Sequence, residues 1–455
     1  MLDNLRVHLI KDQSDFVLFF CDTLSIKKIT DRCAQNYLSK LQNICSSTSN
    51  STFYVNMYDA SQLNLTDEFT QSENSQNPIH TASDEKFSTL ILHITNDCNM
   101  MCKYCFANHG LYASDRGLMS PQTAIRAIEI YYKRYGYIRE IKFFGGEPMM
   151  NTETIREVCV HVHKMLKRKA IQQLPRFKII TNGTILNPEF ISTIVEYKIQ
   201  VVFSIDGPSE IHDKLRYFRG GRASYDLIMS NFKKLKDYTN GEQPCSIEAT
   251  YTKAHEEAGY SIAEIIRYFY DKLGMNKGQV NISMVNLPFS NPLSLPDYSK
   301  HWISYVEEVK KLQLETGRFY GDLKIIGMLH RLKNKKCIPP DELCPAGHRW
   351  AAVSAKGEIY PCLMFTDNEF FKMGNVYDED VLNSALYKKI TSDFSNIHPQ
   401  ENEPCKNCFV NNVCGKCAGI NHFMTGNVAC TDHMHCQAIR KVFEVLISGI
   451  ANDIF

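Results

Sequence analysis

The chain has 455 residues, which exceeds the usual size of one domain and predicts two or three structural units. Its 51 Lys and Arg residues nearly balance 50 Asp and Glu residues, so overall charge favours neither nucleic acid nor a membrane surface as a partner. The amino terminus lacks a secretory signal pattern, and no segment approaches the roughly 20 apolar residues that cross a bilayer. In the cytoplasmic location that we therefore expect, 17 cysteines indicate metal ligation rather than disulfide bonds.

Residues 1–85 predict a small amino-terminal module that ends in a polar linker. The runs RVHLI and DFVLFF are strand-like, and Ile29–Leu41 has the spacing of an amphipathic helix. The segment from Ser46 to Lys86 is mostly polar and cannot bury enough apolar surface to form a core of its own.

Residues 86–320 repeat a unit in which a short apolar run precedes a segment of helical periodicity. This alternation predicts an α/β fold of parallel strands joined by right-handed crossovers, as an open sheet or a barrel. The predicted strands are TLILHI, EIKFF, FKIIT, VVFSI, SIEATY and QVNISMV. The predicted helices lie in MSPQTAIRAIEIYYKRY, which begins at Pro121 after Ser120, and in TETIREVCVHVHKML, NPEFISTIVEYK, SYDLIMSNFKKLKDY and AEIIRYFYDKLG. Both architectures bind ligands at the carboxyl ends of their strands.

Three cysteines follow the first predicted strand, in DCNMMCKYCF. Cys98, Cys102 and Cys105 have the spacing C-x3-C-x2-C and supply three thiolates, whereas structural clusters and zinc sites use four protein ligands. The fourth position is thus left for another ligand, which favours a catalytic role for the three thiolates. A zinc knuckle without its fourth ligand, or a set of packed cysteines, is the alternative interpretation of this motif.

With Tyr104 and Phe106, this loop resembles the cluster loop of the radical S-adenosylmethionine (SAM) enzymes. The resemblance implies a [4Fe–4S] cluster whose unique iron is chelated by SAM, and an electron transfer that cleaves SAM to a 5′-deoxyadenosyl radical. It also implies that the six β/α units form a partial (β/α)6 barrel of the TIM type.

A second motif follows the second predicted strand. Two glycines let the backbone approach a ligand closely, and a carboxylate at a strand end can accept hydrogen bonds from an ammonium group. The motif matches the GGEP sequence that holds the methionyl amine of SAM in that family, and it comprises Gly145, Gly146, Glu147 and Pro148.

Polar residues also follow the third and fourth predicted strands, where the barrel mouth is expected. Asn182 lies after the third strand, and Ser204, Asp206 and Arg216 follow at and beyond the end of the fourth. By resemblance these residues bind the cofactor, with Ser204 and Asp206 beside the ribose and carboxylate of SAM and Arg216 paired with that carboxylate. A role in capping a turn is the alternative for Asp206 and Asn182.

Residues 321–455 contain nine cysteines. Two CxxC pairs could hold one zinc as a ribbon, but a single zinc would leave five cysteines unused. The order of the cysteines, with Gly357 five residues before the cysteine of YPC, resembles the SPASM extension, which carries two auxiliary [4Fe–4S] clusters and implies three clusters in all. By that resemblance one auxiliary cluster uses Cys337, Cys344, Cys362 and Cys417, and the other uses Cys405, Cys408, Cys414 and Cys436, with Cys430 as an alternative to Cys436.

The motifs together resemble the radical SAM–SPASM maturases of ribosomally made peptides. DCNMMCKYCFANHGLYASDRGLMSP and SIDGPSEIHDKLRYFRGGRASYD look most like the six-cysteine-peptide, ranthipeptide and sactipeptide maturases and the quinohemoprotein amine dehydrogenase maturase. Sulfatase maturases have a proposed catalytic aspartate after the cysteine of YPC, where this chain has Leu363, and leucine cannot accept a proton.

The expected reaction is therefore formation of Cys thioether crosslinks, of the sactionine or ranthionine type, in a Cys-rich precursor peptide. A carbon–carbon crosslinking cyclase, a sulfatase-maturase-like formylglycine enzyme and a non-catalytic iron–sulfur electron carrier are the alternatives. The resemblance implies a precursor peptide and an electron donor such as flavodoxin or ferredoxin as partners, and it makes residues 1–85 a possible leader-peptide-binding element.

Overall fold

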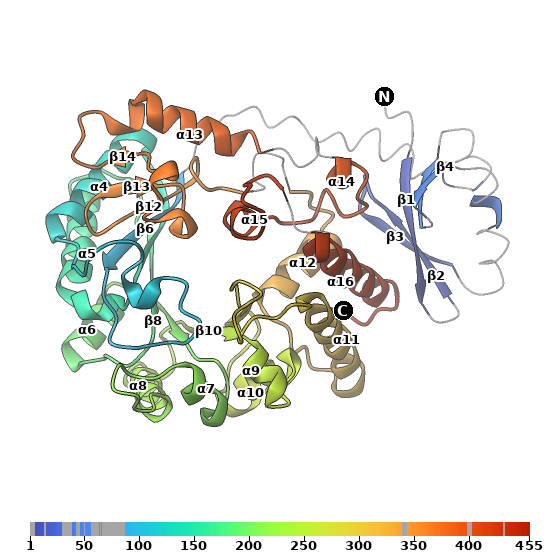
Figure 1. Ribbon diagram of the computed structural model, residues 1–455, viewed down its shortest axis with the longest axis horizontal. Coiled ribbons are helices and arrows are strands. Elements are labelled where there is room, and N and C mark those ends of the chain that lie inside the picture. Colours follow the sequence, from blue (N-terminus) through green and yellow to red (C-terminus); the bar gives the residue numbers. More distant parts are fainter. Residues whose placement is uncertain are drawn as a thin grey trace.

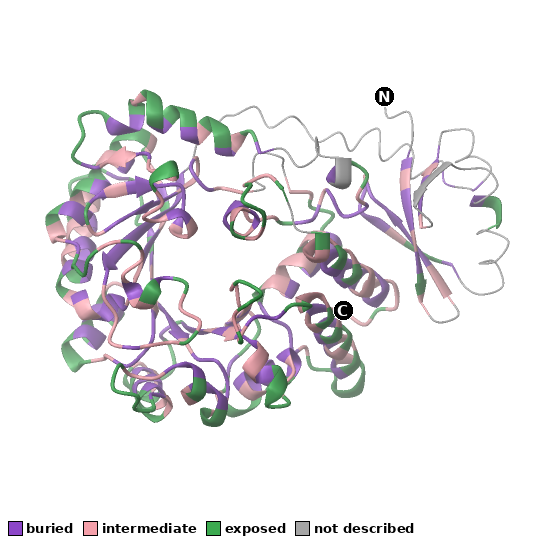
Figure 2. Ribbon diagram, in the orientation of Figure 1, coloured by how far each residue is buried: buried purple, intermediate pink, exposed green. Residues whose placement is uncertain are grey.

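The computed structural model describes residues 5–12, 15–29, 39–41, 46–49, 51–55, 63, 65, 87–338, 344–397, 403–430 and 433–455. These residues form one long curved sheet and one small antiparallel sheet, which lie at opposite ends of the molecule (Figure 1). Buried residues occur along the strands of both sheets, whereas the outer helices carry exposed residues on one side (Figure 2). No helix in the described ranges combines the length and apolar content needed to cross a membrane.

The long sheet has the strand order β11-β10-β9-β8-β7-β6-β12-β13-β14. The six strands from β6 to β11 pair in chain order, each parallel to its neighbour. Strands β11 and β14 are the two edge strands and do not pair with each other, so the sheet does not close. All six predicted strands and the partial barrel are therefore confirmed. The six strands are β6 (Phe87–Thr95), β7 (Ile138–Gly145), β8 (Arg176–Thr181), β9 (Gln200–Ser204), β10 (Cys245–Tyr251) and β11 (Val280–Met284).

Helices cover the outer face of these parallel strands (Figure 1). The predicted ones are α4 (Pro121–Tyr135), α5 (Thr152–Lys167), α6 (Pro188–Glu196), α8 (Tyr225–Tyr238) and α10 (Ile262–Lys272). Helix α4 begins as predicted, because the Ser120 hydroxyl accepts a hydrogen bond from the Thr123 backbone N–H and Pro121 occupies the first turn. The structure adds α7 (Ser209–Leu215) and α9 (Lys253–Glu257), which are too short for a periodic pattern to predict.

The carboxyl-terminal part extends the long sheet. Strand β12 (Trp350–Val353) pairs in parallel with β6, and β13 (Glu358–Tyr360) and β14 (Gly374–Asn375) continue the sheet in antiparallel fashion. Helices α11 (Tyr298–Thr316) and α16 (His433–Ala451) pack against each other between the long and the small sheet (Figure 1). The remaining helices are α12 (Leu323–Lys333), α13 (Ala385–Ser395), α14 (Glu403–Lys406) and α15 (Ala418–Thr425). The predicted boundary at residues 320 and 321 falls between α11 and α12.

The small sheet confirms the two predicted strands of the amino-terminal module. Its antiparallel order is β3-β2-β1-β5-β4, formed by β1 (Leu5–Asp12), β2 (Asp15–Phe20), β3 (Ser25–Ile29), β4 (Ser46–Ser49) and β5 (Thr52–Val55). One face, with Leu18 and Phe20, buries a small core of its own, whereas Val17 and Phe19 on the other face join the main core. The predicted helix does not begin at Ile29, which ends β3, and its residues 30–38 lie outside the described residues.

Asp322 fastens the start of α12 to α11 and to β11. Its fully buried carboxylate accepts hydrogen bonds from the Tyr305 hydroxyl (3.2 Å) and from the backbone N–H groups of Ile325 (3.1 Å) and Ile282 (3.4 Å). Replacing Asp322 by Ala leaves these buried donors unpaired, so we expect the free energy of unfolding in urea to fall by about 2–3 kcal/mol.

Asp393→Ala on α13 is the matched control, because the carboxylate of Asp393 is exposed and pairs only with Lys389 of the same helix. This control should change the free energy of unfolding by less than about 0.5 kcal/mol. Equal stability of Asp322→Ala and the wild type would show that the buried carboxylate does not hold these elements together.

Candidate active site at the barrel mouth

The loop after β6 brings the three predicted cysteine ligands together. Cys98, Cys102 and Cys105 are half-buried. Burial raises the pKa of the Cys98 thiol to about 12, with the nearby charges of Glu147 and Cys102 acting in the same direction. Burial likewise raises the pKa of Cys102 to about 11, against the lowering effect of Arg216 and with Cys105 adding to the rise. The three thiols therefore lie within electrostatic reach of one another at the carboxyl end of β6.

Hydrogen bonds from two other segments fix this loop. The Asp97 carbonyl accepts from the Glu147 backbone N–H (2.8 Å), and the Asp97 carboxylate accepts from the Cys98 backbone N–H (2.8 Å) and pairs with Arg219 (2.5 Å). Arg219 also donates through Nε to the Cys98 carbonyl (2.9 Å), and the Met101 N–H donates to the Tyr217 carbonyl (2.8 Å). The loop is thus held between the GGEP motif and the segment that follows α7.

The two glycines of the GGEP motif make room for the cluster loop. A Cβ atom on Gly145 would lie 2.4 Å from the Thr95 carbonyl oxygen, and a Cβ atom on Gly146 would lie 2.0 Å from the Asp97 carbonyl oxygen. Gly145 also has a φ of +124°, a conformation that favours glycine. From the sequence, the two glycines were predicted to let a ligand approach the backbone closely. In the structure, the backbone of the cluster loop occupies that position.

Glu147 joins the ends of β7 and β8. Its carboxylate is fully buried and accepts hydrogen bonds from the Met149 N–H (2.9 Å), the Thr181 hydroxyl (2.7 Å) and the Asn182 N–H (2.6 Å). Burial raises the pKa of this carboxyl, and the three hydrogen bonds act in the opposite direction. Donors of the protein itself thus surround the carboxylate, and its contact with an ammonium group stays a prediction. Pro148, which follows, begins a buried 3-10 turn.

Tyr104, Asp206 and Arg216 form a buried chain beside the cysteines. Arg216 donates through Nη1 to the Tyr104 hydroxyl (2.6 Å), which donates to the Asp206 carboxylate (2.5 Å). That carboxylate also accepts from the Thr250 N–H on β10 (3.0 Å), so Asp206 bonds across the barrel mouth instead of capping its own turn. The buried Nε of Arg216 has no hydrogen-bond partner among the described residues.

Three further predicted residues lie around the same mouth. The Asn182 side-chain amide donates to the Asn99 side chain (2.9 Å), and its oxygen accepts from Thr184 two residues on, so it serves both its turn and the cluster loop. Ser204 is half-buried at the end of β9. Phe106 is 53% exposed and makes an edge contact with Tyr112.

The carboxyl-terminal thiols fall into two groups. In the first, the Cys362 thiol is buried, which raises its pKa, and Cys417 and Cys344 lie close enough to raise it further. Cys337 lies just after α12, where the N–H of its neighbour Ile338 donates to the Asn412 carbonyl (2.7 Å), and its place in this group stays a prediction.

The second group joins Cys414 to three other thiols. Burial raises the pKa of Cys414 to about 12; Lys416 lowers it, and Cys408, Cys436 and Cys405 raise it. Cys430 is exposed in the loop before α16, so Cys436 is the cysteine that the structure brings to this group.

These groups fit the cofactors that the motifs imply. In the described part of the chain, no three His, Cys, Asp or Glu side chains converge as one bound metal ion would require. Iron–sulfur clusters are held by Cys thiolates, which the barrel mouth and both carboxyl-terminal groups can supply. At the barrel mouth, three thiols leave one corner open, and Arg216 offers an unpaired buried donor to an anionic group of SAM.

Charged residues on the face of the sheet opposite the helices were not predicted from the sequence. Lys142 on β7 is 9% exposed and lies 5.3 Å from the ring centre of Trp350, and Glu248 on β10 accepts from Asn281 (3.2 Å). Burial lowers the pKa of Lys142, whereas Glu140 and Glu248 raise it. The sequence pattern could have indicated these residues, because polar residues alternate with apolar ones in EIKFF and SIEATY. Strands that are buried between two apolar layers are instead continuous apolar runs.

We expect Gly146→Ala to prevent assembly of the cluster at Cys98, Cys102 and Cys105, because the added methyl group meets the Asp97 carbonyl. Iron content and the electron paramagnetic resonance spectrum of the reduced protein would measure this loss. Gly117→Ala is the control, since a Cβ atom on Gly117 meets nothing within 4 Å. Full cluster occupancy in Gly146→Ala would contradict the proposed packing.

His212 makes the barrel mouth sensitive to acid. The ring is fully buried, with Nδ1 accepting from the Asp206 N–H (3.2 Å), and burial lowers its pKa to about 4. Between pH 6.5 and 4 the unfolded chain binds a proton there that the folded protein excludes, so stability falls over that window by up to about 3 kcal/mol. Urea unfolding of His212→Gln should show a smaller loss than the wild type, and equal losses would exclude this role.

Two family profiles match the chain. The Radical SAM superfamily matches residues 92–257, and the iron–sulfur cluster-binding domain SPASM matches residues 344–409. The radical SAM cyclopropyl synthase TigE of Paramaledivibacter caminithermalis is 25% identical over 385 residues, which cover 81% of this chain and 75% of that protein. The cysteine-type anaerobic sulfatase-maturating enzyme of Clostridium novyi is 24% identical over 374 residues, covering 80% and 96%.

Solved structures share the fold. The enzyme anSMEcpe with bound AdoMet has a TM-score of 0.66 at 20% identity, covering 81% of this chain and 100% of that one. Streptococcus suis SuiB bound to precursor peptide SuiA has a TM-score of 0.56 at 14% identity, covering 95% and 98%. The family profiles thus show that the chain contains a Radical SAM domain and a SPASM iron–sulfur domain, and these domains support SAM and iron–sulfur clusters as its cofactors.

Proposed function

We propose that this enzyme forms Cys thioether crosslinks, of the sactionine or ranthionine type, in a ribosomally made precursor peptide. The observation that carries the proposal is the pairing of β12 with β6, which joins the segment that bears the Cys344, Cys362 and Cys417 group to the strand that leads into the cluster loop. Solved relatives include SuiB with its precursor peptide SuiA and anSMEcpe with a peptide, which supports a peptide substrate.

When bound, SAM and its cluster supply the radical that removes a hydrogen atom from a peptide carbon. Joining that carbon to a peptide thiol also releases one proton and one electron. The chain must therefore accept the proton, hold an electron acceptor near the new bond and exclude water from the mouth. The Cys344, Cys362 and Cys417 group is where the acceptor cluster of this proposal would be held.

Asp367 is the candidate proton acceptor, a role that the leucine after YPC, Leu363, cannot fill. It lies five residues after Cys362 in a left-handed conformation (φ 61°), and its Oδ2 accepts from the Ala113 N–H (3.3 Å), just beyond the cluster loop. Its Oδ1 is buried without a hydrogen-bond partner in the described part of the chain. An unpaired buried carboxylate oxygen is costly unless a substrate or water occupies it, which supports a role in proton transfer.

The same carboxylate favours formylglycine formation as a second candidate. That reaction also needs a proton acceptor. Asp367 could take the place of the aspartate that follows YPC in sulfatase maturases, where this chain has Leu363. A carbon–carbon crosslink would use the same parts without involving a peptide thiol. A simple electron carrier would have no use for the GGEP motif or the polar mouth.

The remaining partners and cofactors belong to the same proposal. Three [4Fe–4S] clusters would be held by the three groups of thiols, with flavodoxin or ferredoxin as the electron donor in the cytoplasm. Residues 1–85 would bind the leader peptide at an edge of the small sheet, by adding it as a further strand. The SuiB match covers 95% of the chain and so includes this module, which supports a shared architecture.

The proposal is tested with a Cys-rich peptide encoded beside the gene, incubated anaerobically with the reduced enzyme and SAM. We expect a loss of two hydrogens per link and thiols that resist alkylation; Cys98→Ala should form neither product nor 5′-deoxyadenosine. The same mass loss with free thiols would indicate a carbon–carbon bond, and formylglycine in a Cys-type sulfatase peptide would favour the second candidate.

Asp367→Asn should lower the rate of crosslink formation at least about ten-fold while 5′-deoxyadenosine still forms, because the amide cannot accept the thiol proton. The pH dependence of the rate would change as well. Asp378→Asn, an exposed carboxylate nearby in the sequence, is the control. An unchanged crosslinking rate in Asp367→Asn would exclude Asp367 as the acceptor.

A further inference from the structure

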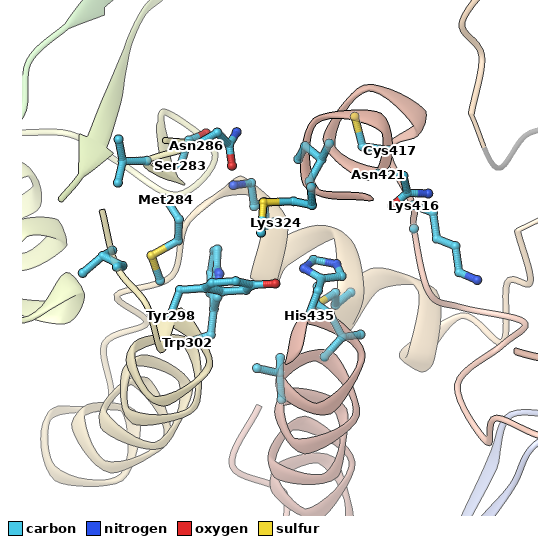
Figure 3. Close-up of a pocket in the computed structure, with 18 of the residues that line it drawn as sticks. Ser283, Met284, Asn286, Tyr298, Trp302, Lys324, Lys416, Cys417, Asn421 and His435 are labelled. Carbon is cyan, nitrogen blue, oxygen red and sulfur yellow. The ribbon is translucent and has the colours of Figure 1, made fainter. Parts of the chain in front are cut away.

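A cavity of about 400 Å³ lies between the end of β11, helices α11 and α12, and the SPASM helices α15 and α16. This volume lies in the range of small-molecule and peptide side-chain sites. Trp302, Tyr298 and Met284 form much of its apolar wall (Figure 3). Cys417, which belongs to the group with Cys344 and Cys362, also lines it, so the cavity adjoins that thiol group.

Helix α12 contributes the charge of this cavity. Lys324, Gly327 and Arg331 line it and recur at helical spacing, so one stripe of α12 carries a cation, a small residue and a second cation. Gly327 is unusual inside a helix, where it costs about 1 kcal/mol relative to Ala. A Cβ atom there would meet only the Arg331 guanidinium, at 3.6 Å, so the glycine leaves open space between the cations.

Both cations lack a carboxylate partner. Lys324 donates to the Ile282 carbonyl (2.7 Å) and lies 5.1 Å from the ring centre of Trp302, and Arg331 donates through Nε to the Val413 carbonyl (3.1 Å). Neither forms an ion pair with any Asp or Glu that the structure describes. Burial lowers the pKa of both groups, whereas Asp322, Glu248 and Cys417 act in the opposite direction on Lys324, and Cys414 does so on Arg331.

The described wall of the cavity contains no carboxylate beside these two cations. No Asp or Glu is among the described residues that line the cavity, and the other ionisable nitrogens belong to Lys416 and His435. Lys416 points away from the other labelled side chains in Figure 3 and donates to the Cys405 thiol. The cavity thus presents apolar and aromatic surface together with two cations that form no ion pair with a described carboxylate.

We propose that this cavity binds an acidic residue of the precursor peptide together with the apolar residue beside it. The peptide carboxylate pairs with Lys324 and Arg331, and the apolar side chain packs against Trp302 in the space that Gly327 leaves. This inference rests on the proposed function for the identity of the ligand, and it assigns substrate selection to α12. A peptide carboxylate would be the direct ion-pair partner that neither cation has among the described residues, which makes it the matching ligand.

The test uses the holoenzyme, immobilised anaerobically, and random heptapeptides displayed on phage as the probe. Selected peptides should be enriched in Asp or Glu next to an aromatic or aliphatic residue. A synthetic copy of the best peptide should bind about ten-fold more tightly than its Asn or Gln counterpart. Equal binding of the two peptides to the wild type would overturn the proposal.

Four variants separate the parts of the site. The double variant Lys324→Gln with Arg331→Gln should abolish the ten-fold preference for the acidic peptide, and Lys324→Arg should keep it. Gly327→Leu should weaken the binding of both the acidic peptide and its amide counterpart, because the larger side chain fills the space. Lys311→Gln, an exposed lysine on α11, is the control and should change nothing. An unchanged preference in the double variant would overturn the proposal, provided that circular dichroism and iron content show an intact protein.

The experiments distinguish a failure of the cavity assignment from a failure of the proposed thioether function. If the selected peptides bind with the acidic preference but acquire no crosslink, the thioether function is wrong and the cavity assignment stands. If the encoded peptide is crosslinked at equal rates by the wild type and the double variant, the function stands and the cavity does not select the substrate.

Discussion

The close approach of the cluster loop to the GGEP turn is the contact on which the active site depends. Gly145 and Gly146 bring the end of β7 against the carbonyls of Thr95 and Asp97, at separations that exclude a side chain. Glu147 then ties this turn to β8 through three buried hydrogen bonds. Three thiols on a loop of otherwise irregular backbone are thereby held at a fixed place, which is what a cluster with one open corner requires.

One continuous sheet connects this loop to the rest of the protein. Since β12 pairs in parallel with β6, the SPASM thiols are placed by backbone hydrogen bonds rather than by a flexible linker. The small sheet is attached similarly to the second thiol group, through the ring of His8 stacked on Phe409 and the bond from Arg6 to the Lys406 carbonyl. The small sheet, the carboxyl-terminal thiol groups and the cluster loop are thus joined by direct contacts.

Two sets of buried charged residues lie within this arrangement. Lys142 and Glu248 occupy the face of the sheet opposite the helices, and Lys324 and Arg331 line the cavity beyond β11. Lys142 pairs with Glu140 (3.9 Å), whereas Lys324 and Arg331 form no ion pair with a described carboxylate, so the retention of these two cations is more readily understood through ligand recognition than through folding. The unpaired buried oxygen of Asp367, beside the segment that follows the cluster loop, fits the same reasoning.

The sequence by itself determined the family, the six β/α units and the three cysteines of the cluster loop, because these depend on local periodicity and on ligands a few residues apart. It also indicated the grouping of the later thiols, through resemblance. Only the tertiary structure decided that Cys436 rather than Cys430 lies near Cys414, that the glycines accommodate backbone, and that Lys324 and Arg331 line one cavity. Those relations join residues far apart in the chain, and the pairing of strands and the packing of α11, α12 and α16 fix them.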